Sequence, residues 1–238
     1  MEVVTEEKKK LKIVIAIPGN SFSGKFLISW TNTLNTLWQS QKYDIVISPG
    51  VSSYVTFARM QTLGLDVLKG LDQKPFNGME FDIWITIDSD IIFTPEQLIE
   101  LIESTEIHPI VSGVYRMADL QNLAFVEKWD VDYFSKNGRF EFMNSEKFDD
   151  WKKINPEQKY MKVNYTGMGF MAIKSHVLNS LIYPYFNGEL QELKNSEGKL
   201  IRDIMSEDVC FCKNLQNNGF DIMINTNLRV GHEKLIVI

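Results

Sequence analysis

Two aspartates separated by one serine end an apolar run in the segment WITIDSDIIFTPEQ, residues 84–97. Residues two apart in an extended chain face the same way, so the carboxylates of Asp88 and Asp90 can point into one crevice. Adjacent carboxylates repel each other and cost free energy to desolvate unless water or a cation meets them. Hard oxygen ligands of this kind suit Mg²⁺ or Mn²⁺, which keep open positions for phosphate oxygens.

The same tripeptide has a plainer interpretation, because aspartates favour the bend between a strand and a helix. Its surroundings favour a binding site. Seven mostly apolar residues, 81–87, precede the pair, and Thr94, Pro95 and Gln97 match a helix start with a threonine cap. If 81–87 is a central strand, both aspartates emerge at its carboxyl end, where α/β sheets bind ligands.

The elements that must position this pair alternate along the first half of the chain. Apolar runs predict strands at 11–18, 43–50, 81–87 and 108–115, and helical patterns lie at 25–40, at 52–70 and after residue 94. In the first helix an apolar face is expected from the spacing of Leu27, Trp30, Leu34 and Leu37. This order is typical of an α/β fold of Rossmann-like type, with a mixed, mostly parallel sheet and helices on both faces.

Residues 120–163 break that rhythm and predict an antiparallel insertion or flap. Within it, Asn137 and Gly138 give a strong hairpin-turn signal. Later strands are expected in 165–173 and 220–234, separated by a helix over about 206–218 that Ser206 could cap and Gly219 could end. We predict one domain over 11–238, preceded by a disordered charged tail at 1–10.

Composition narrows the function classes. The 238 residues are 44% hydrophobic, which is enough for a sizeable core, and the net charge of −6 disfavours nucleic acid as the main partner. Only Cys210 and Cys212 could form disulfides, and their spacing on a predicted helix argues against a disulfide framework. No apolar run reaches the roughly 20 residues of a membrane span, and no signal-peptide pattern opens the chain, so we expect a cytoplasmic protein.

With these elements placed, WITIDSD resembles the metal-binding Asp-x-Asp of the GT-A fold glycosyltransferases, which move a sugar from a nucleotide diphosphate to an acceptor. The resemblance covers residues 11–234 and is to the small bacterial or viral type. Each motif is short, and the specificity comes from their common order. The further matching segments are IAIPG, FARMQTL, YTGMGFMAIKSHVL, SEDVCFCKNLQNNGFDI and VGHEK.

The resemblance implies a nucleotide-sugar donor, a UDP-sugar by family habit. Pro18 and Gly19 end the first strand where the nucleotide base packs, although they could be only a turn. Arg59 lies near the nucleotide and diphosphate, a task for which a guanidinium fork is suited. Where many relatives have asparagine after this arginine, the chain has Met60, and a solvated helix arginine is the alternative. Ser89, inside the Asp-x-Asp motif, is expected to join the donor site.

The resemblance also implies a metal site of Asp88, Asp90 and His232, with Asp88 contacting the ribose or the metal. In metal-dependent relatives a histidine near the carboxyl end completes the site, and a nearby lysine, here Lys234, can reach the diphosphate. A nitrogen ligand beside carboxylates favours Mn²⁺ over Mg²⁺. Most lone histidines are not ligands, so His232 rests on its context in VGHEK.

On the acceptor side, Gly167, Met168 and Gly169 would let the donor sugar or the acceptor approach the backbone, although a bulge is the alternative. Trp129 and other aromatics of the insertion could stack on sugar rings or form a small satellite core.

The acidic pair Glu207 and Asp208 opens a predicted helix, where carboxylates also serve as ordinary dipole partners. The resemblance makes Asp208 the catalytic base that takes the proton of the acceptor hydroxyl, which gives inversion at the sugar carbon.

The expected function is therefore metal-dependent transfer of a sugar, of the hexosyltransferase type, to a hydroxyl of a glycan, lipid-linked or protein acceptor. A retaining reaction stays open if Asp208 only binds the acceptor. One alternative is a phosphatase of the haloacid dehalogenase type with Asp88 as nucleophile, although that family carries the motif on its first strand. Another is a non-catalytic nucleotide-sugar or glycan-binding module.

Overall fold

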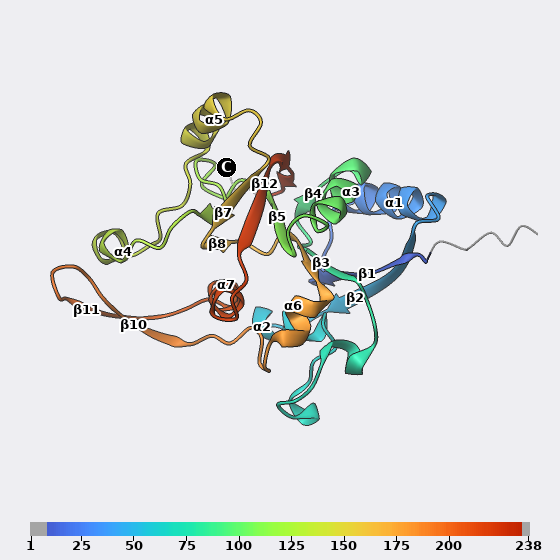
Figure 1. Ribbon diagram of the computed structural model, residues 1–238, viewed down its shortest axis with the longest axis horizontal. Helices are drawn as coiled ribbons and strands as arrows, with labels where there is room; N and C mark the ends of the chain where they lie inside the picture. The colour runs from blue at the N-terminus through green and yellow to red at the C-terminus, as the bar shows by residue number, and fades with distance from the viewer. Residues whose placement is uncertain (1–8, 235–238) are drawn as a thin grey trace, which may run out of the picture.

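The computed structural model describes residues 9–234 of the chain (Figure 1), so most of the predicted tail, residues 1–8, lies outside the described part. Strands and helices alternate through the first half as predicted. In chain order the elements are β1 (Leu11–Pro18), α1 (Gly24–Gln39), β2 (Tyr43–Gly50), α2 (Val55–Gln61), η1 (Val67–Lys69), η2 (Pro75–Gly78), β3 (Ile83–Ile87), β4 (Ile91–Ile92), α3 (Pro95–Ser104), β5 (Ile110–Val114), β6 (Phe125–Val126), α4 (Val131–Asn137), α5 (Ser145–Ile154), β7 (Tyr160–Val163), β8 (Tyr165–Thr166), β9 (Phe170–Lys174), α6 (Ser175–Ser180), β10 (Leu190–Lys194), β11 (Leu200–Ile204), α7 (Glu207–Asn217), β12 (Ile222–Arg229) and β13 (Gly231–His232).

A seven-stranded sheet in the order β2-β1-β3-β9-β5-β12-β7 forms the centre of the molecule. Strands β2, β1, β3, β5 and β12 run in one direction, whereas β9 and the edge strand β7 are antiparallel to their neighbours. The predicted mixed, mostly parallel α/β sheet is confirmed. Strand β3, which carries the aspartate pair at its carboxyl end, is paired on both sides and buried along its whole length.

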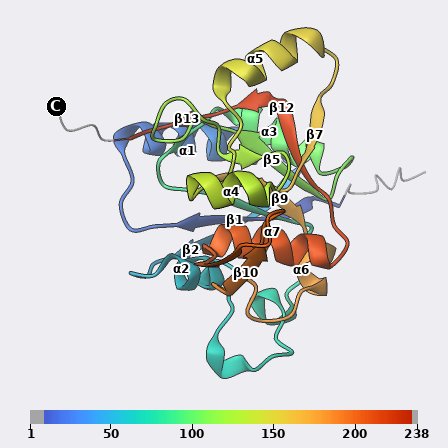
Figure 2. The same ribbon diagram turned by 90° about the vertical axis from the view of Figure 1, so that its left-hand side faces the viewer.

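Helices cover both faces of this sheet, with α1 and α3 on one face and α2, α6 and α7 on the other (Figures 1 and 2). The alternation of side chains along a strand explains the two apolar layers. In β1, Ile13 and Ile15 pack with α1 and α3, whereas Val14 and Ala16 pack with the opposite helices. Both layers hold the strand ends, and therefore the site residues, in place.

Two of the predicted helices differ in detail. In α1, Leu34 and Leu37 are buried and Trp30 is partly buried as predicted, but Leu27 is 52% exposed and Phe26, at 1% exposed, takes its place in the core. Helix α2 ends at Gln61, well short of residue 70, since Gly64 takes a left-handed φ of 63° and closes the helix by donating to the Gln61 carbonyl. The predicted cap of α3 is confirmed, with a reciprocal capping box between Thr94 and Gln97.

The insertion contains helices where a hairpin was predicted, so the hairpin at Asn137 and Gly138 is wrong. Asp130 caps α4 by accepting a hydrogen bond from the Tyr133 amide, and Gly138 ends the helix in the left-handed region at φ 65°. The same conformational freedom that suits a hairpin turn serves here as a helix stop. Antiparallel pairing in 120–163 joins β6 with β8 and β7 with β12, and isolated antiparallel bridges join Arg116 with Leu123 and Asn122 with Asn144.

The stretch predicted as one strand at 165–173 is interrupted, because residues 167–169 (GMG) separate β8 from β9. The antiparallel hairpin of β10 and β11 lies beside the insertion and was not predicted. Its turn contacts α4, where the Ser196 amide donates to Asp132 Oδ1 at 2.8 Å. Cys210 and Cys212 are both buried and free. Within 9–234, no helix is long and apolar enough to cross a bilayer.

Candidate functional site

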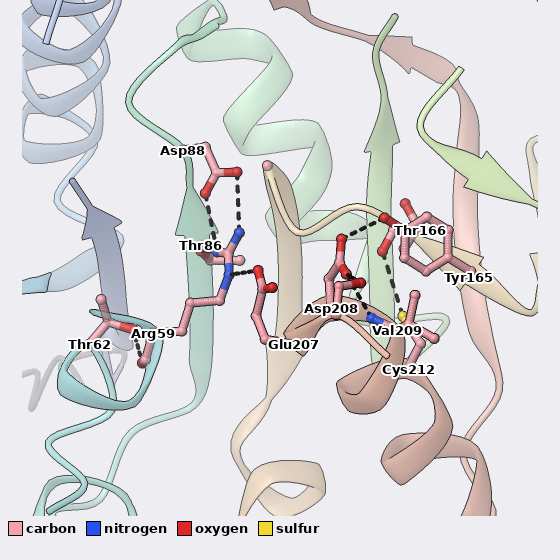
Figure 3. Close-up of polar contacts among 12 residues, drawn as sticks. Arg59, Thr62, Thr86, Asp88, Tyr165, Thr166, Glu207, Asp208, Val209 and Cys212 are labelled. Atoms are coloured by element: carbon pink, nitrogen blue, oxygen red, sulfur yellow. Dashed lines mark hydrogen bonds and ion pairs between the residues drawn. The ribbon is translucent and has the colours of Figure 1, made fainter. Parts of the chain in front are cut away.

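A buried arginine joins two acidic segments at the carboxyl edge of the sheet (Figure 3). Arg59 comes from α2, and its two terminal nitrogens donate to the two carboxylate oxygens of Asp88 at 3.1 and 3.3 Å. Its Nε donates to Glu207 Oε1 at 3.4 Å from the start of α7. A fork of this geometry suits a bidentate carboxylate. Because Asp90 follows Asp88 by two residues and Asp208 follows Glu207, the arginine brings the donor and acceptor segments of the prediction to one place.

The charges in this cluster are strongly coupled. Burial alone would lower the pKa of the Arg59 guanidinium, but Asp88 and Glu207 outweigh burial and raise that pKa above its ordinary value. Burial, together with the neighbouring Asp208, raises the pKa of Glu207 despite the opposing effect of Arg59. Arg59 is 5% exposed, so the solvated-arginine alternative is wrong. The guanidinium is held by protein carboxylates, and its contact with a nucleotide stays a prediction.

A second cluster forms where β13 pairs with β4 directly after Asp90. The Nε2 atom of His232 lies 3.3 Å from Asp90 Oδ2, and Nζ of Lys234 lies 2.5 Å from the same oxygen. Burial raises the pKa of Asp90, but hydrogen bonds and charge from His232 and Lys234 outweigh it and lower the pKa to about 2. The structure therefore brings His232 and Lys234 to Asp90, which lies 142 and 144 positions before them in the sequence.

The orientation of the His232 ring fits metal binding. Its Nδ1 lies 2.6 Å from the carbonyl oxygen of Arg116, which can only accept, so Nδ1 carries the proton. In the charged ring Nε2 donates to Asp90, whereas in the neutral ring Nε2 presents its lone pair to the carboxylate, and a cation between them would then bind both. Carboxylate and imidazole donors with room for phosphate and water suit Mn²⁺ or Mg²⁺.

Asp88 lies apart from this pair in its contacts, because both of its oxygens hold Arg59. Within residues 9–234, no group of three or more His, Cys, Asp and Glu side chains is arranged to hold a metal ion. The ligand set that the geometry offers is Asp90 and His232, with the remaining positions open to phosphate oxygens or water. A direct metal contact of Asp88 stays a prediction.

Asp208 is held at both oxygens at the start of α7. Its Oδ2 accepts from the Tyr165 hydroxyl at 2.5 Å, and its Oδ1 accepts from the Val209 amide at 2.8 Å and from the Ser206 hydroxyl. Ser206 is the residue before α7, as predicted, but its side chain bonds to Asp208 instead of capping a helix amide. The carboxylate is therefore oriented by its neighbours and is partly open to solvent.

Gly167 and Gly169 make room for the side chain of Tyr115, the residue that directly follows β5. A Cβ at Gly167 would lie 2.2 Å from the Tyr115 hydroxyl oxygen, and one at Gly169 would lie 2.8 Å from it. The Gly169 amide donates to that oxygen at 3.0 Å, and the Tyr115 ring packs edge-on against His232 at 5.1 Å. The backbone at Gly167 and Gly169 is therefore approached closely, as predicted, but the approaching group is the Tyr115 side chain. A contact of these glycines with a sugar stays a prediction.

The other predicted contact residues lie around this rim. Pro18 ends β1, and Gly19 has φ 128° with its Cβ position 3.1 Å from Ser89 Oγ, so a larger residue at 19 would collide with the Asp-x-Asp loop. Met168 is 1% exposed and packs in the core. Trp129 is partly buried and packs on Phe140 and Tyr165, as the satellite-core interpretation expects. Contacts of these residues with donor or acceptor stay predictions.

Three contributors to the site were missed from the sequence. Tyr115 follows the carboxyl end of a strand, and Tyr165 comes two residues before Gly167; these positions could have marked both tyrosines as candidate site residues. Arg116 acts through its backbone carbonyl, which leaves no signal in the sequence. A cavity of about 240 Å³ adjoins His232 and Lys234 beneath the 114–123 loop. A larger cavity of about 610 Å³ lies at the amino ends of β1, β2 and β3 and includes none of the site residues.

Comparisons with known proteins bear on the fold. No protein-family profile matches the chain, and no curated protein matches it in sequence. Among solved structures, GalNAc-T7 with UDP, GalNAc and Mn²⁺ aligns over 95% of this chain with a TM-score of 0.52 and 10% identity. A197 from STIV aligns over 96% of both chains with a TM-score of 0.48 and 16% identity. The 4-diphosphocytidyl-2C-methyl-D-erythritolsynthase of Anaerococcus prevotii DSM 20548 aligns over 94% of this chain and 90% of its own, with a TM-score of 0.44 and 13% identity.

The chain spans 43% of the GalNAc-T7 chain that it matches. At this identity the likeness concerns the course of the backbone. Together with the strand order and the placement of the rim residues, it shows that the chain has the GT-A-like α/β fold predicted from its sequence.

Proposed function

We propose that this protein is a metal-dependent glycosyltransferase that moves a sugar from a nucleotide diphosphate to a hydroxyl acceptor with inversion. The proposal depends on the convergence of Asp90, His232 and Lys234 at the edge of the sheet. Nε2 of His232 lies 3.3 Å and Nζ of Lys234 lies 2.5 Å from the same Asp90 oxygen, Oδ2. Two metal donors and an ammonium group beside an open cavity suit a diphosphate and its counter-ion.

On the donor side, Asp90 and His232 would hold Mn²⁺, or Mg²⁺ in its place. The bound ion would supply positive charge to the departing diphosphate. Lys234 contributes an ammonium group that can pass from Asp90 to a phosphate oxygen when the ion neutralises the carboxylate. Arg59 neutralises Asp88, so Asp90 is the carboxylate of the pair that remains for the ion. Tyr115 packs on the His232 ring and keeps it facing Asp90.

On the acceptor side, Asp208 would accept the proton of the attacking hydroxyl. Its two oxygens are held by Tyr165, Ser206 and the Val209 amide, so the carboxylate is oriented before substrate arrives. Glu207 is bound to Arg59 and is 13% exposed, which suits a structural role beside the base. A base on one side of the sugar and a leaving diphosphate on the other give inversion.

The phosphatase alternative is disfavoured by the same contacts. A phosphate-attacking Asp88 needs a free oxygen, but both of its oxygens accept hydrogen bonds from Arg59. The first strand, β1, carries no aspartate at its carboxyl end. The non-catalytic alternative would leave the oriented Asp208 without a task.

The proposal is tested by thermal shift with UDP, GDP, ADP and CDP, each with Mn²⁺, with Mg²⁺ and with EDTA. Uridine is the first choice because the structure of GalNAc-T7, whose fold this chain shares, contains UDP. A nucleotide at 100 times its Kd stabilises the folded state by about 2.7 kcal/mol, which raises Tm by roughly 5 to 10 °C for a chain of this size. We expect that shift with Mn²⁺ and its loss in EDTA.

Asp90→Asn and His232→Ala should each abolish the metal-dependent shift and the release of UDP from UDP-sugars. Asp203→Asn is the matched control, because Asp203 is an exposed carboxylate on β11 and has no contact with Asp90, His232 or Lys234 in the described structure. Wild-type shifts that are equal with Mn²⁺ and with EDTA, or absent across the panel, would contradict the proposal.

A further inference from the structure

We infer that Tyr165 is a positioning residue for the proposed base: its hydroxyl fixes the direction of the Asp208 carboxylate. This inference rests on the proposed function for its catalytic meaning. It goes beyond the acidic pair itself, because it assigns a task to a tyrosine of the strand facing α7.

The contact is direct and short. The Tyr165 hydroxyl donates to Asp208 Oδ2 at 2.5 Å across 43 positions of sequence (Figure 3). Hydrogen bonds from a neutral hydroxyl to a carboxylate are stronger than those between neutral groups. The other oxygen, Oδ1, is held from within α7 and its preceding residue, so Tyr165 is the partner that reaches Asp208 from a different element.

The tyrosine ring is itself held in place. Tyr165 is 7% exposed and pairs with Val126 in the two-stranded sheet of β6 and β8. Its ring packs against Trp129 at 6.1 Å and Phe142 at 6.0 Å, both from the insertion. Burial, with the charge of Asp208, raises the pKa of the Tyr165 phenol, so the hydroxyl keeps its proton at neutral pH. It is a permanent donor toward the carboxylate.

Other charges lie near the same carboxylate. Arg59 from α2 contributes positive charge and the adjacent Glu207 contributes negative charge. Buried Tyr115 and Cys212 are neutral neighbours, because burial raises the pKa of each. Removing the Tyr165 hydroxyl leaves these groups in place and deletes one donor.

The consequence for catalysis is a fixed direction of the base. With Tyr165 present, Oδ2 of Asp208 keeps one direction. Without it, Asp208 gains rotamer freedom, so fewer molecules carry the base in the right place.

Tyr165→Phe tests this directly without any substrate. The protein is labelled with ¹³C at the aspartate carboxyl carbons, and the Asp208 signal is identified by its absence in Asp208→Asn. Loss of this donor should change the ¹³C chemical shift of that signal at pH 7 in Tyr165→Phe, because the carboxyl carbon senses the hydrogen bond to its oxygen. An unchanged chemical shift would overturn the inference.

The catalytic meaning is read from Mn²⁺-dependent hydrolysis of UDP-glucose and UDP-N-acetylglucosamine, with water as acceptor. In Tyr165→Phe, kcat should fall about tenfold with donor KM unchanged, because the misplaced base acts in the transition state and not in donor binding. Incorporation of 3-fluorotyrosine at 165, which keeps the hydroxyl, should restore both readouts and also serves if the phenylalanine variant folds poorly.

Tyr160→Phe is the matched control, because the Tyr160 hydroxyl is buried without a hydrogen-bond partner in the described structure and lies on β7. It should leave the ¹³C chemical shift of Asp208 and the hydrolysis unchanged; a change as large as that of Tyr165→Phe would count against a specific role. If wild-type protein hydrolyses no nucleotide sugar, the proposed function fails, while the ¹³C chemical shift still decides whether Tyr165 holds the carboxylate.

Discussion

Replacing Arg59 with methionine should destabilise the fold more than any exposed charge change, and the structure gives the size. The Arg59 side chain is 6% exposed and bonds to Asp88 and Glu207, whose side chains are 31% and 13% exposed. Methionine has a similar length but leaves both carboxylates without their cation. Breaking a buried ion pair by removing one partner costs about 3 to 5 kcal/mol. Because Asp88 is partly solvated, we expect the lower end, about 3 kcal/mol.

The free energy of unfolding is measured by urea titration at pH 7, with thermal melting as a second readout. A loss of about 3 kcal/mol corresponds to a Tm decrease of roughly 6 to 12 °C for a chain of this size. Arg59→Lys keeps the charge but loses the fork, so it should cost about 2 kcal/mol. Arg59→Met combined with Glu207→Gln should recover part of the loss, since one of the two stranded charges is then gone.

Arg202→Met is the control for this experiment. Arg202 pairs with Glu192 across β10 and β11 at 2.5 Å, but the two side chains are 66% and 48% exposed, so the loss should stay under about 1 kcal/mol. If Arg59→Met unfolds with a free energy within about 0.5 kcal/mol of wild type, buried ion pairing is not what holds the two acidic segments together.

Three further predictions concern neighbouring residues. Gly167→Ala should cost about 1 to 3 kcal/mol by urea titration, because its Cβ would collide with the Tyr115 hydroxyl, and a Tyr115→Phe background should relieve most of this loss; an unchanged loss there would contradict it. The pKa of Asp90 is lowered to about 2 from 3.8, so its contribution to stability is present above pH 4 and is lost as the pH falls toward 2. The difference in free energy of unfolding between wild type and Asp90→Asn should therefore narrow between pH 4 and 2. A constant difference over that window would refute the pairing. The pKa of Glu207 is raised above 4.5, so its contribution to stability is present below pH 4.5 and is lost as the pH rises. The free energy of unfolding of Glu207→Gln should therefore rise relative to that of wild type between pH 4 and 7. A fall relative to wild type would contradict a pKa raised by burial.

Local pattern determined most of the elements. β-branched runs such as IWITI predict buried strands, and the Thr94 cap with Gln97 fixes the start of α3, because both signals act within a few residues. The order of these elements restricts the fold to a mostly parallel sheet with helices on both faces, and the placement of the aspartate pair at the end of a central strand follows from it.

Local pattern also misled where one signal serves two structures. Asn137 and Gly138 permit a left-handed turn, which ends a helix as readily as it joins two strands, and packing of the insertion chose the helix. At the start of α1 the sequence favoured Leu27 over Phe26 for the core, since both are apolar and only packing against the rest of the fold decides which one is buried.

The sequence by itself determined that carboxylates, a histidine and a lysine of suitable chemistry exist at strand and helix ends. Only the tertiary structure decided their partners: that Arg59 takes Asp88 and Glu207, 148 positions away, that Lys234 and His232 meet Asp90, and that Tyr115 fills the space above the two glycines. These contacts depend on how strands from distant parts of the chain are ordered in the sheet, and short-range periodicity carries no information about that order.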